Sequence, residues 1–154
     1  KFIYELMINE ALEKNKDLFE FFKFMIDYRK KHPVIRKKLD NAVCGMEAMH
    51  AHDVNAERME VPQNAKTLAV SFAGYDRKKG KDDLVYVAVN AYWEEVKITL
   101  PNLANHGAWY LSVDTYGDEK GKYFYQEGEE IRIDREYVMK PRSIVVFTGR
   151  EILR

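Results

Sequence analysis

This sequence has a single cysteine, no excess of positive or negative charge, and no long apolar run. The 154 residues include one cysteine, Cys44, so no internal disulfide can form and a reducing compartment is expected. Lysine plus arginine (25) equals aspartate plus glutamate (25), which gives no electrostatic case for nucleic acid or an anionic membrane as partner. No apolar run approaches the ~20 residues of a membrane span, and no signal segment opens the chain. We therefore expect a cytoplasmic protein.

The sequence opens with a part that has helical character. Residues 2–14 contain neither glycine nor proline, which favours a first helix. A second helix is predicted to follow, because Asp17 and Glu20 have the spacing of a capping box. The positive charges at residues 30–31 suit the carboxyl end of a helix dipole, and Pro33 ends the helix.

The second predicted helix has an unusually wide apolar face. At ~100° per residue its apolar side chains cover an arc of roughly 220°, whereas one packing partner needs little more than ~100°. We therefore expect burial on two sides, one of them by polypeptide outside this chain. Without that polypeptide, the same face is expected to drive self-association or to be covered by the first helix. The side chains predicted to form the face are Phe21, Phe22, Phe24, Met25 and Tyr28.

From Thr67 onward the period of the apolar residues changes to two. Alternating runs occupy residues 67–72, 85–89, 96–100, 109–113, 131–133 and 144–147, and a further short strand is predicted between residues 44 and 52. Short strands separated by turn residues, with no helices between them, predict an antiparallel β-sandwich of Greek-key type with about six to eight strands. The fold class is therefore mainly β, with a helical segment at residues 1–36 and a sandwich domain at residues 37–154.

Several segments, in this order, resemble a known family. Residues 22–33, FKFMIDYRKKHP, resemble the last helix of the catalytic barrel in the α-amylase superfamily. Residues 84–101, LVYVAVNAYWEEVKITLP, resemble the Asn-Ala, aromatic, Leu-Pro hairpin in the carboxy-terminal domain of isoamylases and glycogen-debranching enzymes. Residues 109–115 and 140–147 are similar to later strands of that domain. The resemblance covers residues 14–149.

This resemblance implies a parent glycoside hydrolase whose (β/α)₈ barrel hydrolyses α-1,6 branch linkages in glycogen or starch. A retaining mechanism would need two carboxyl groups about 5 Å apart at the carboxyl ends of barrel strands. Those strands would lie upstream of this chain, so we expect no catalytic residue, no cofactor and no metal here. The expected role is to stabilise the missing barrel, which would be the domain's main partner.

Charged and histidine pairs offer weaker candidates for chemistry. The pairs 82–83, 94–95 and 129–130 are acidic, but adjacent residues of a strand point to opposite faces, and all three are predicted to be solvated turns. His50 and His52 share one face of any strand through them, yet no third zinc ligand with suitable spacing is evident. We therefore expect polar or core histidines, and a buried Cys44 without a reactive thiolate.

Two aromatic residues are the best candidates for a ligand contact. Tyr92 and Trp93 lie at a predicted hairpin turn, where their rings either stack on sugar or pack over the end of the sandwich. Two alternative functions therefore stay open. One is a carbohydrate-binding module for α-glucan, and the other is a free-standing domain that binds a protein through the wide helix face.

Overall fold

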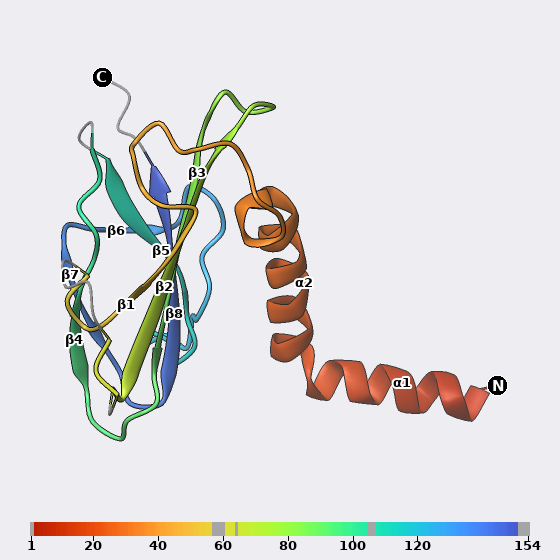
Figure 1. Cartoon of the computed structure of the whole chain (residues 1–154). Coiled ribbons are helices and arrows are strands. Elements are labelled where there is room, and N and C mark those ends of the chain that lie inside the picture. The colour runs from red at the N-terminus through yellow and green to blue at the C-terminus, as the bar shows by residue number, and fades with distance from the viewer. Residues whose placement is uncertain (1, 57–60, 64, 105–106, 151–154) are drawn as a thin grey trace. The chain divides into compact units, whose positions relative to one another are not determined.

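The computed structural model describes residues 2–56, 61–63, 65–104 and 107–150. The chain divides into two compact units, Lys1–Lys31 and His32–Arg154. The first unit contains two helices, α1 (Phe2–Lys14) and α2 (Lys16–Lys31), which are drawn in red and orange in Figure 1. The second contains a short 3₁₀ helix, η1 (Pro33–Ile35), and eight strands. The prediction of a mainly β protein with helices before the strands is confirmed.

The break between the two helices lies at Asn15, as the sequence indicates. Asn15 donates twice to the carbonyl of Ala11 at the end of α1, from its side-chain amide over 2.9 Å and from its backbone amide over 3.1 Å. The carbonyl of Asn15 accepts from the Phe19 amide over 3.0 Å in α2. Because α2 begins at Lys16, Asn15 occupies the cap position, and Asp17 lies two residues later, inside the first turn, so the prediction that Asp17 caps this helix is wrong. Glu20 forms an ion pair with Lys23 at 3.2 Å.

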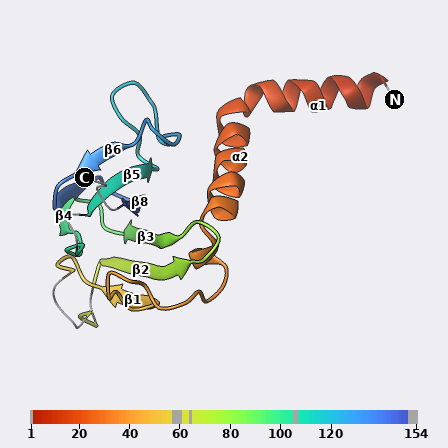
Figure 2. The same cartoon turned by 90° about the horizontal axis from the view of Figure 1, so that it is seen from above.

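The strands form two antiparallel sheets. A six-stranded sheet has the order β1-β2-β3-β8-β5-β6, and Figure 2 shows these strands following one another along a curve. A two-stranded sheet pairs β4 with β7. The bounds are β1 Met49–His52, β2 Thr67–Asp76, β3 Lys81–Asn90, β4 Val96–Thr99, β5 Ala108–Asp114, β6 Ile131–Ile133, β7 Glu136–Met139 and β8 Ser143–Arg150.

The core lies between the two sheets. From the six-stranded sheet, Tyr86 and Phe147 are fully buried, and from the two-stranded sheet, Ile98 and Met139 are fully buried. The rings of Tyr137 in β7 and Phe147 in β8 are 5.3 Å apart, edge to face. In the long strands the core side chains recur at every second position, as Leu84, Tyr86 and Ala88 do in β3.

The sequence prediction of a hairpin at Tyr92 and Trp93 is wrong. β3 pairs with β2 and β8, whereas β4 pairs with β7, so residues 91–95 carry the chain from one sheet to the other. β7 is a strand that the sequence analysis does not predict. Its four residues are too few for a clear alternation, and β7 is defined by its partner β4 rather than by its own pattern.

Candidate functional site

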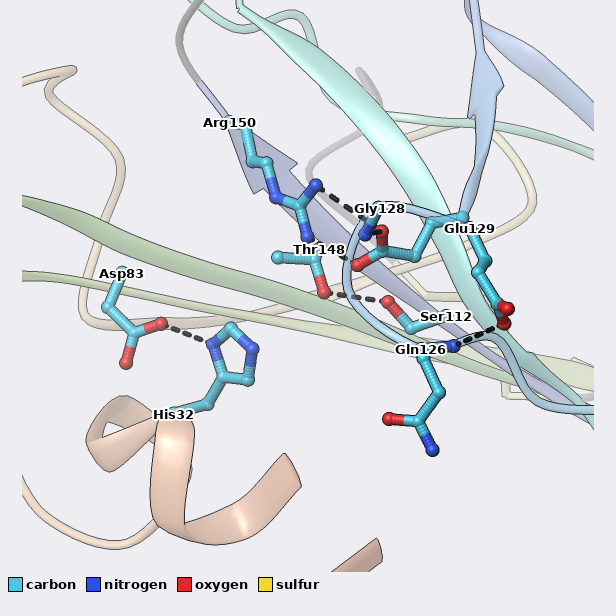
Figure 3. A network of polar contacts seen from close by, with 9 residues as sticks. His32, Asp83, Ser112, Gln126, Gly128, Glu129, Thr148 and Arg150 are labelled. Carbon is cyan, nitrogen blue, oxygen red and sulfur yellow. Dashed lines mark hydrogen bonds and ion pairs between the residues drawn. The ribbon is translucent and has the colours of Figure 1, made fainter. Parts of the chain in front are cut away.

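The first acidic pair is not at a solvated turn, as the sequence suggested, but inside β3. The β2–β3 hairpin turns within residues 77–80, where Gly80 takes a φ of 65°, so both strands extend further than predicted. Asp83 has a side chain that is only 3% exposed. It accepts a hydrogen bond from His32 Nδ1 over 2.6 Å, drawn in Figure 3, and another from the Val34 amide over 3.0 Å.

The neighbouring carboxylate holds a different part of the chain. Asp82 accepts hydrogen bonds from the amides of Val43 and Cys44, each over 2.8 Å. Because consecutive residues of a strand point to opposite faces, the two carboxylates fix two separate points of the connector, residues 32–44. They act as structural clamps, and they do not converge on one bond of a substrate.

The acidic residues after β5 are also engaged in structure. Glu130 forms an ion pair with Arg150 and accepts from the Gly128 amide over 2.6 Å, and its side chain is only 6% exposed, so the prediction of a solvated turn is wrong for this residue. Glu129 pairs with Lys122 at 2.9 Å, and this hydrogen bond holds the pKa of Glu129 below its ordinary value. Figure 3 draws the hydrogen bond that Glu129 accepts from the Gln126 amide and, separately, the hydrogen bond between the hydroxyls of Ser112 and Thr148.

His50 and His52 lie on one face of β1, with ring centroids 4.8 Å apart. His52 is buried, with Nε2 2.8 Å from the Ser71 hydroxyl and Nδ1 3.1 Å from the Ala56 carbonyl. A carbonyl can only accept, so Nδ1 carries the proton and Ser71 donates to Nε2. Burial lowers the pKa of His52, which keeps the ring neutral. This arrangement makes His52 a core residue, whereas His50 faces Glu47 at 3.1 Å.

No metal-binding constellation accompanies these histidines. Within the described ranges, no group of three or more His, Cys, Asp or Glu side chains could hold a metal ion. Cys44 is partly buried, and burial is the main cause that raises its thiol pKa, so its thiolate is disfavoured at neutral pH.

Residues 91–95 carry the chain from β3 in one sheet to β4 in the other. They include Tyr92 and Trp93 and form a corner that several hydrogen bonds hold in place. Asn90, at the end of β3, is 1% exposed and uses its amide on both sides of the crossing. Its Nδ2 donates to the carbonyls of Glu94 (2.9 Å) and Lys140 (3.0 Å), and its Oδ1 accepts from the Tyr92 amide (3.0 Å). One buried side chain thus ties residues 91–95 to the turn between β7 and β8.

The turn between β7 and β8 also forms polar contacts with residues 91–95. Arg142 has a φ of 51°, in the left-handed region, and its amide donates to the Tyr92 carbonyl over 3.0 Å. Lys140 forms an ion pair with Glu95. The sequence analysis finds the two aromatic residues but misses Asn90 as their support, although an Asn at the end of a strand, just before a turn, is a known signal of side-chain capping.

The corner displays an aromatic pair together with a cation. Trp93 is 65% exposed and Tyr92 is partly buried, with ring centroids 4.2 Å apart and planes tilted by 40°. Lys66 places its Nζ 3.8 Å from the Tyr92 centroid and 5.7 Å from that of Trp93. The Lys66 carbonyl accepts from the Ala91 amide over 3.0 Å, so the backbone positions this cation beside the rings. Lys66 is a further residue of the site that the sequence analysis misses.

The predicted packing face of α2 contains both buried and exposed side chains. Phe24 and Tyr28 are buried, Phe21 and Met25 are partly buried, and Phe22 is 58% exposed. A groove of about 420 Å³ lies between the two helices, and all but one of its lining residues are apolar. Its lining is Ile8, Ala11, Leu12, Asn15, Leu18, Phe19 and Phe22. That this face contacts a catalytic barrel stays a prediction.

A second apolar surface crosses the outer face of the six-stranded sheet. Leu68 in β2, Val89 in β3 and Ile144 in β8 are direct cross-strand neighbours, and all three are exposed. An outward row of this kind is unusual for an antiparallel sheet that faces water, where polar residues normally alternate with the core positions. Among the described residues, none of the helices has both the length and the hydrophobicity that a membrane span requires.

The sandwich unit matches the model of a known protein family. The family model described as "Isoamylase, C-terminal" matches residues 43–148, which reach from before β1 into β8. The comparison with curated proteins finds no match.

Proposed function

Because the chain belongs to the isoamylase C-terminal family, we propose that it is the non-catalytic carboxy-terminal part of an enzyme that hydrolyses α-1,6 linkages in glycogen or starch. Its role is to stabilise the catalytic barrel of the same polypeptide. The observation that carries this proposal is the family match over residues 43–148, because it spans almost the whole sandwich. We place the parent enzyme in the cytoplasm.

The structural contacts that the acidic side chains make support a non-catalytic, accessory role. Retaining hydrolysis of a glycosidic bond needs two carboxyl groups about 5 Å apart and aimed at the same bond. In this chain, Asp82 and Asp83 hold different segments of a connector, and Glu129 and Glu130 are each paired with a cation. These groups stabilise the fold, and the catalytic pair belongs to the barrel.

The two apolar surfaces support a large protein partner. Exposed apolar side chains gather on α2 and along the row of Leu68, Val89 and Ile144, and monomeric proteins rarely leave contiguous patches of this kind uncovered. A neighbouring barrel of the same polypeptide would cover both surfaces without the entropy cost of binding a separate molecule. We assign the faces that contain Phe22 and Leu68 to this contact.

The test uses the complete polypeptide from the natural reading frame. Leu68→Asp should lower the melting temperature of the enzyme by several degrees, because a charge would be buried in the contact. Val138→Asp is the matched control, since Val138 is similarly exposed on a strand of the other sheet and should change little. Equal effects of the two variants would remove the assigned contact.

The reading frame itself separates the accessory role from the alternative of a free-standing protein-interaction domain. The accessory role requires a barrel of the α-amylase type upstream in the same frame, and the isolated barrel should unfold at a lower temperature than the complete enzyme. A frame without such a barrel would overturn the proposal in favour of the free-standing domain.

A further inference from the structure

We propose that the corner formed by Lys66, Tyr92 and Trp93 is a surface binding site for the glucose rings of an α-glucan chain. The identity of the sugar rests on the proposed function, whereas the presence of a site rests on the geometry of the corner. Trp93 is the stacking ring, Lys66 is the hydrogen-bond donor, and Asn90 is a positioning residue.

The first argument is the rigidity of the loop. Its residues 91–95 are held by the three hydrogen bonds of Asn90, by the Arg142 amide and by the pair of Lys140 with Glu95. A buried amide with satisfied donors and acceptors fixes the backbone around it, because each broken bond would leave a buried polar group unpaired. A loop built in this way presents Trp93 in one orientation and loses little entropy when a ligand binds.

The second argument is the conformation of Arg142. A non-glycine residue in the left-handed region costs roughly 1 kcal/mol or more, and such outliers are retained where the surroundings require them. Here the amide of Arg142 donates to the Tyr92 carbonyl, so the strained turn braces the aromatic pair directly. The chain therefore keeps a locally unfavourable turn beside a tryptophan that is 65% exposed.

The chemistry of the corner selects the class of ligand. A glucose ring offers C–H groups on its faces and hydroxyls around its rim, so it can stack on the flat Trp93 ring while a hydroxyl accepts from a neighbouring donor. The Lys66 ammonium has three donors and lies close to both rings. Because Lys66 already lies 3.8 Å from the centroid of Tyr92, that ring is a poor site for a cationic ligand.

The charges around the corner favour a neutral ligand over an anionic one. The three cations Lys66, Lys140 and Arg142 stand beside two carboxylates, Glu94 and Glu95, so one net positive charge remains, and Lys140 is already paired with Glu95. A phosphate chain would need a broader basic face than this. The 40° tilt between the rings leaves Trp93 as the main flat surface, so we expect weak binding to single sugars and stronger retention by a polymer that offers many sites.

The experiment is affinity electrophoresis of the 154-residue chain through native gels that contain glycogen. The wild-type chain should be retarded relative to a gel without polymer, Trp93→Ala should lose most of the retardation, and Lys66→Ala should lose part of it. Tyr4→Ala is the matched control, because Tyr4 is also an exposed aromatic residue but belongs to the other compact unit. Melting temperatures should stay close to wild type for all three variants, since the truncated side chains are exposed.

The outcomes distinguish this inference from the proposed function. Wild-type migration without retardation, or retardation that Trp93→Ala leaves intact, would overturn the site while leaving the role in barrel stability untouched. Equal retardation in gels that contain a β-linked glucan would overturn the assignment to α-glucan. Retardation by glycogen that depends on Trp93 supports the site even if the reading frame lacks a barrel.

Discussion

The helical unit and the sandwich unit treat their apolar residues in opposite ways. In the sandwich, Tyr86, Phe147 and Met139 are fully buried by neighbouring strands. In the helices, large apolar side chains such as Ile3 and Met7 stay exposed. Both units are rich in apolar residues, so composition does not distinguish them. The difference teaches that the strands build a core of their own, although the outer row of Leu68, Val89 and Ile144 stays exposed, whereas the helices expose many of their large apolar side chains.

The largest expected effect is on the sandwich core. Phe147→Ala should lower the free energy of unfolding by about 3–5 kcal/mol, because it leaves a cavity beside Tyr86 and Tyr137. Ile144→Ala is a matched control on the same strand, since Ile144 points outward and is exposed, and it should cost less than about 1 kcal/mol. Urea denaturation followed by circular dichroism measures both. Similar losses for the two variants would show that the sandwich does not bury its residues as described.

A smaller effect is expected at the connector that opens the sandwich unit. Asp83→Ala should cost about 1–3 kcal/mol, because the Val34 amide and His32 lose a buried acceptor. Amide hydrogen exchange should speed up at Val34 but not at Val43. Asp82→Ala should give the reverse pattern, since Asp82 accepts from Val43 and Cys44. Uniform acceleration along the whole connector in either variant would contradict two separate clamps.

The sequence predicts the strands that have long alternating runs. β2, β3, β5 and β8 contain enough residues for the period of two to stand out, but the period does not say which face forms the core. In β2 the apolar run that contains Leu68 suggests one face, whereas Leu68 is exposed and the buried core residue is its neighbour Ala69. β7 escapes prediction because a four-residue strand depends on its partner for definition. The same limit explains the hairpin error at Tyr92, since a turn and a crossing between sheets have the same local chemistry.

The functional features were less predictable, because they depend on contacts between distant residues. Tyr92 and Trp93 can be chosen from the sequence as exposed aromatic residues next to a turn. The support from Asn90 depends on Lys140, 50 positions away, and no local pattern reveals it. The burial of Asp83 depends likewise on His32, 51 positions away, so two adjacent acids at the end of a strand resemble a solvated turn until the fold is known.

The smallest effect on folding stability is expected for a substitution in the helical unit, which tests whether its exposed apolar side chains serve association. Phe22→Glu should change the free energy of unfolding of the sandwich by less than about 0.5 kcal/mol, because Phe22 is exposed and belongs to the other compact unit. It should nevertheless reduce self-association of the 154-residue chain, measured by light scattering, since it places a charge in the apolar groove between the helices. Lys30→Gln changes the net charge by the same amount, and Lys30 is not among the residues that line the groove, so this variant should leave the association unchanged. A wild-type chain that stays monomeric at every concentration would contradict the view that the helices hold apolar surface in reserve for a partner.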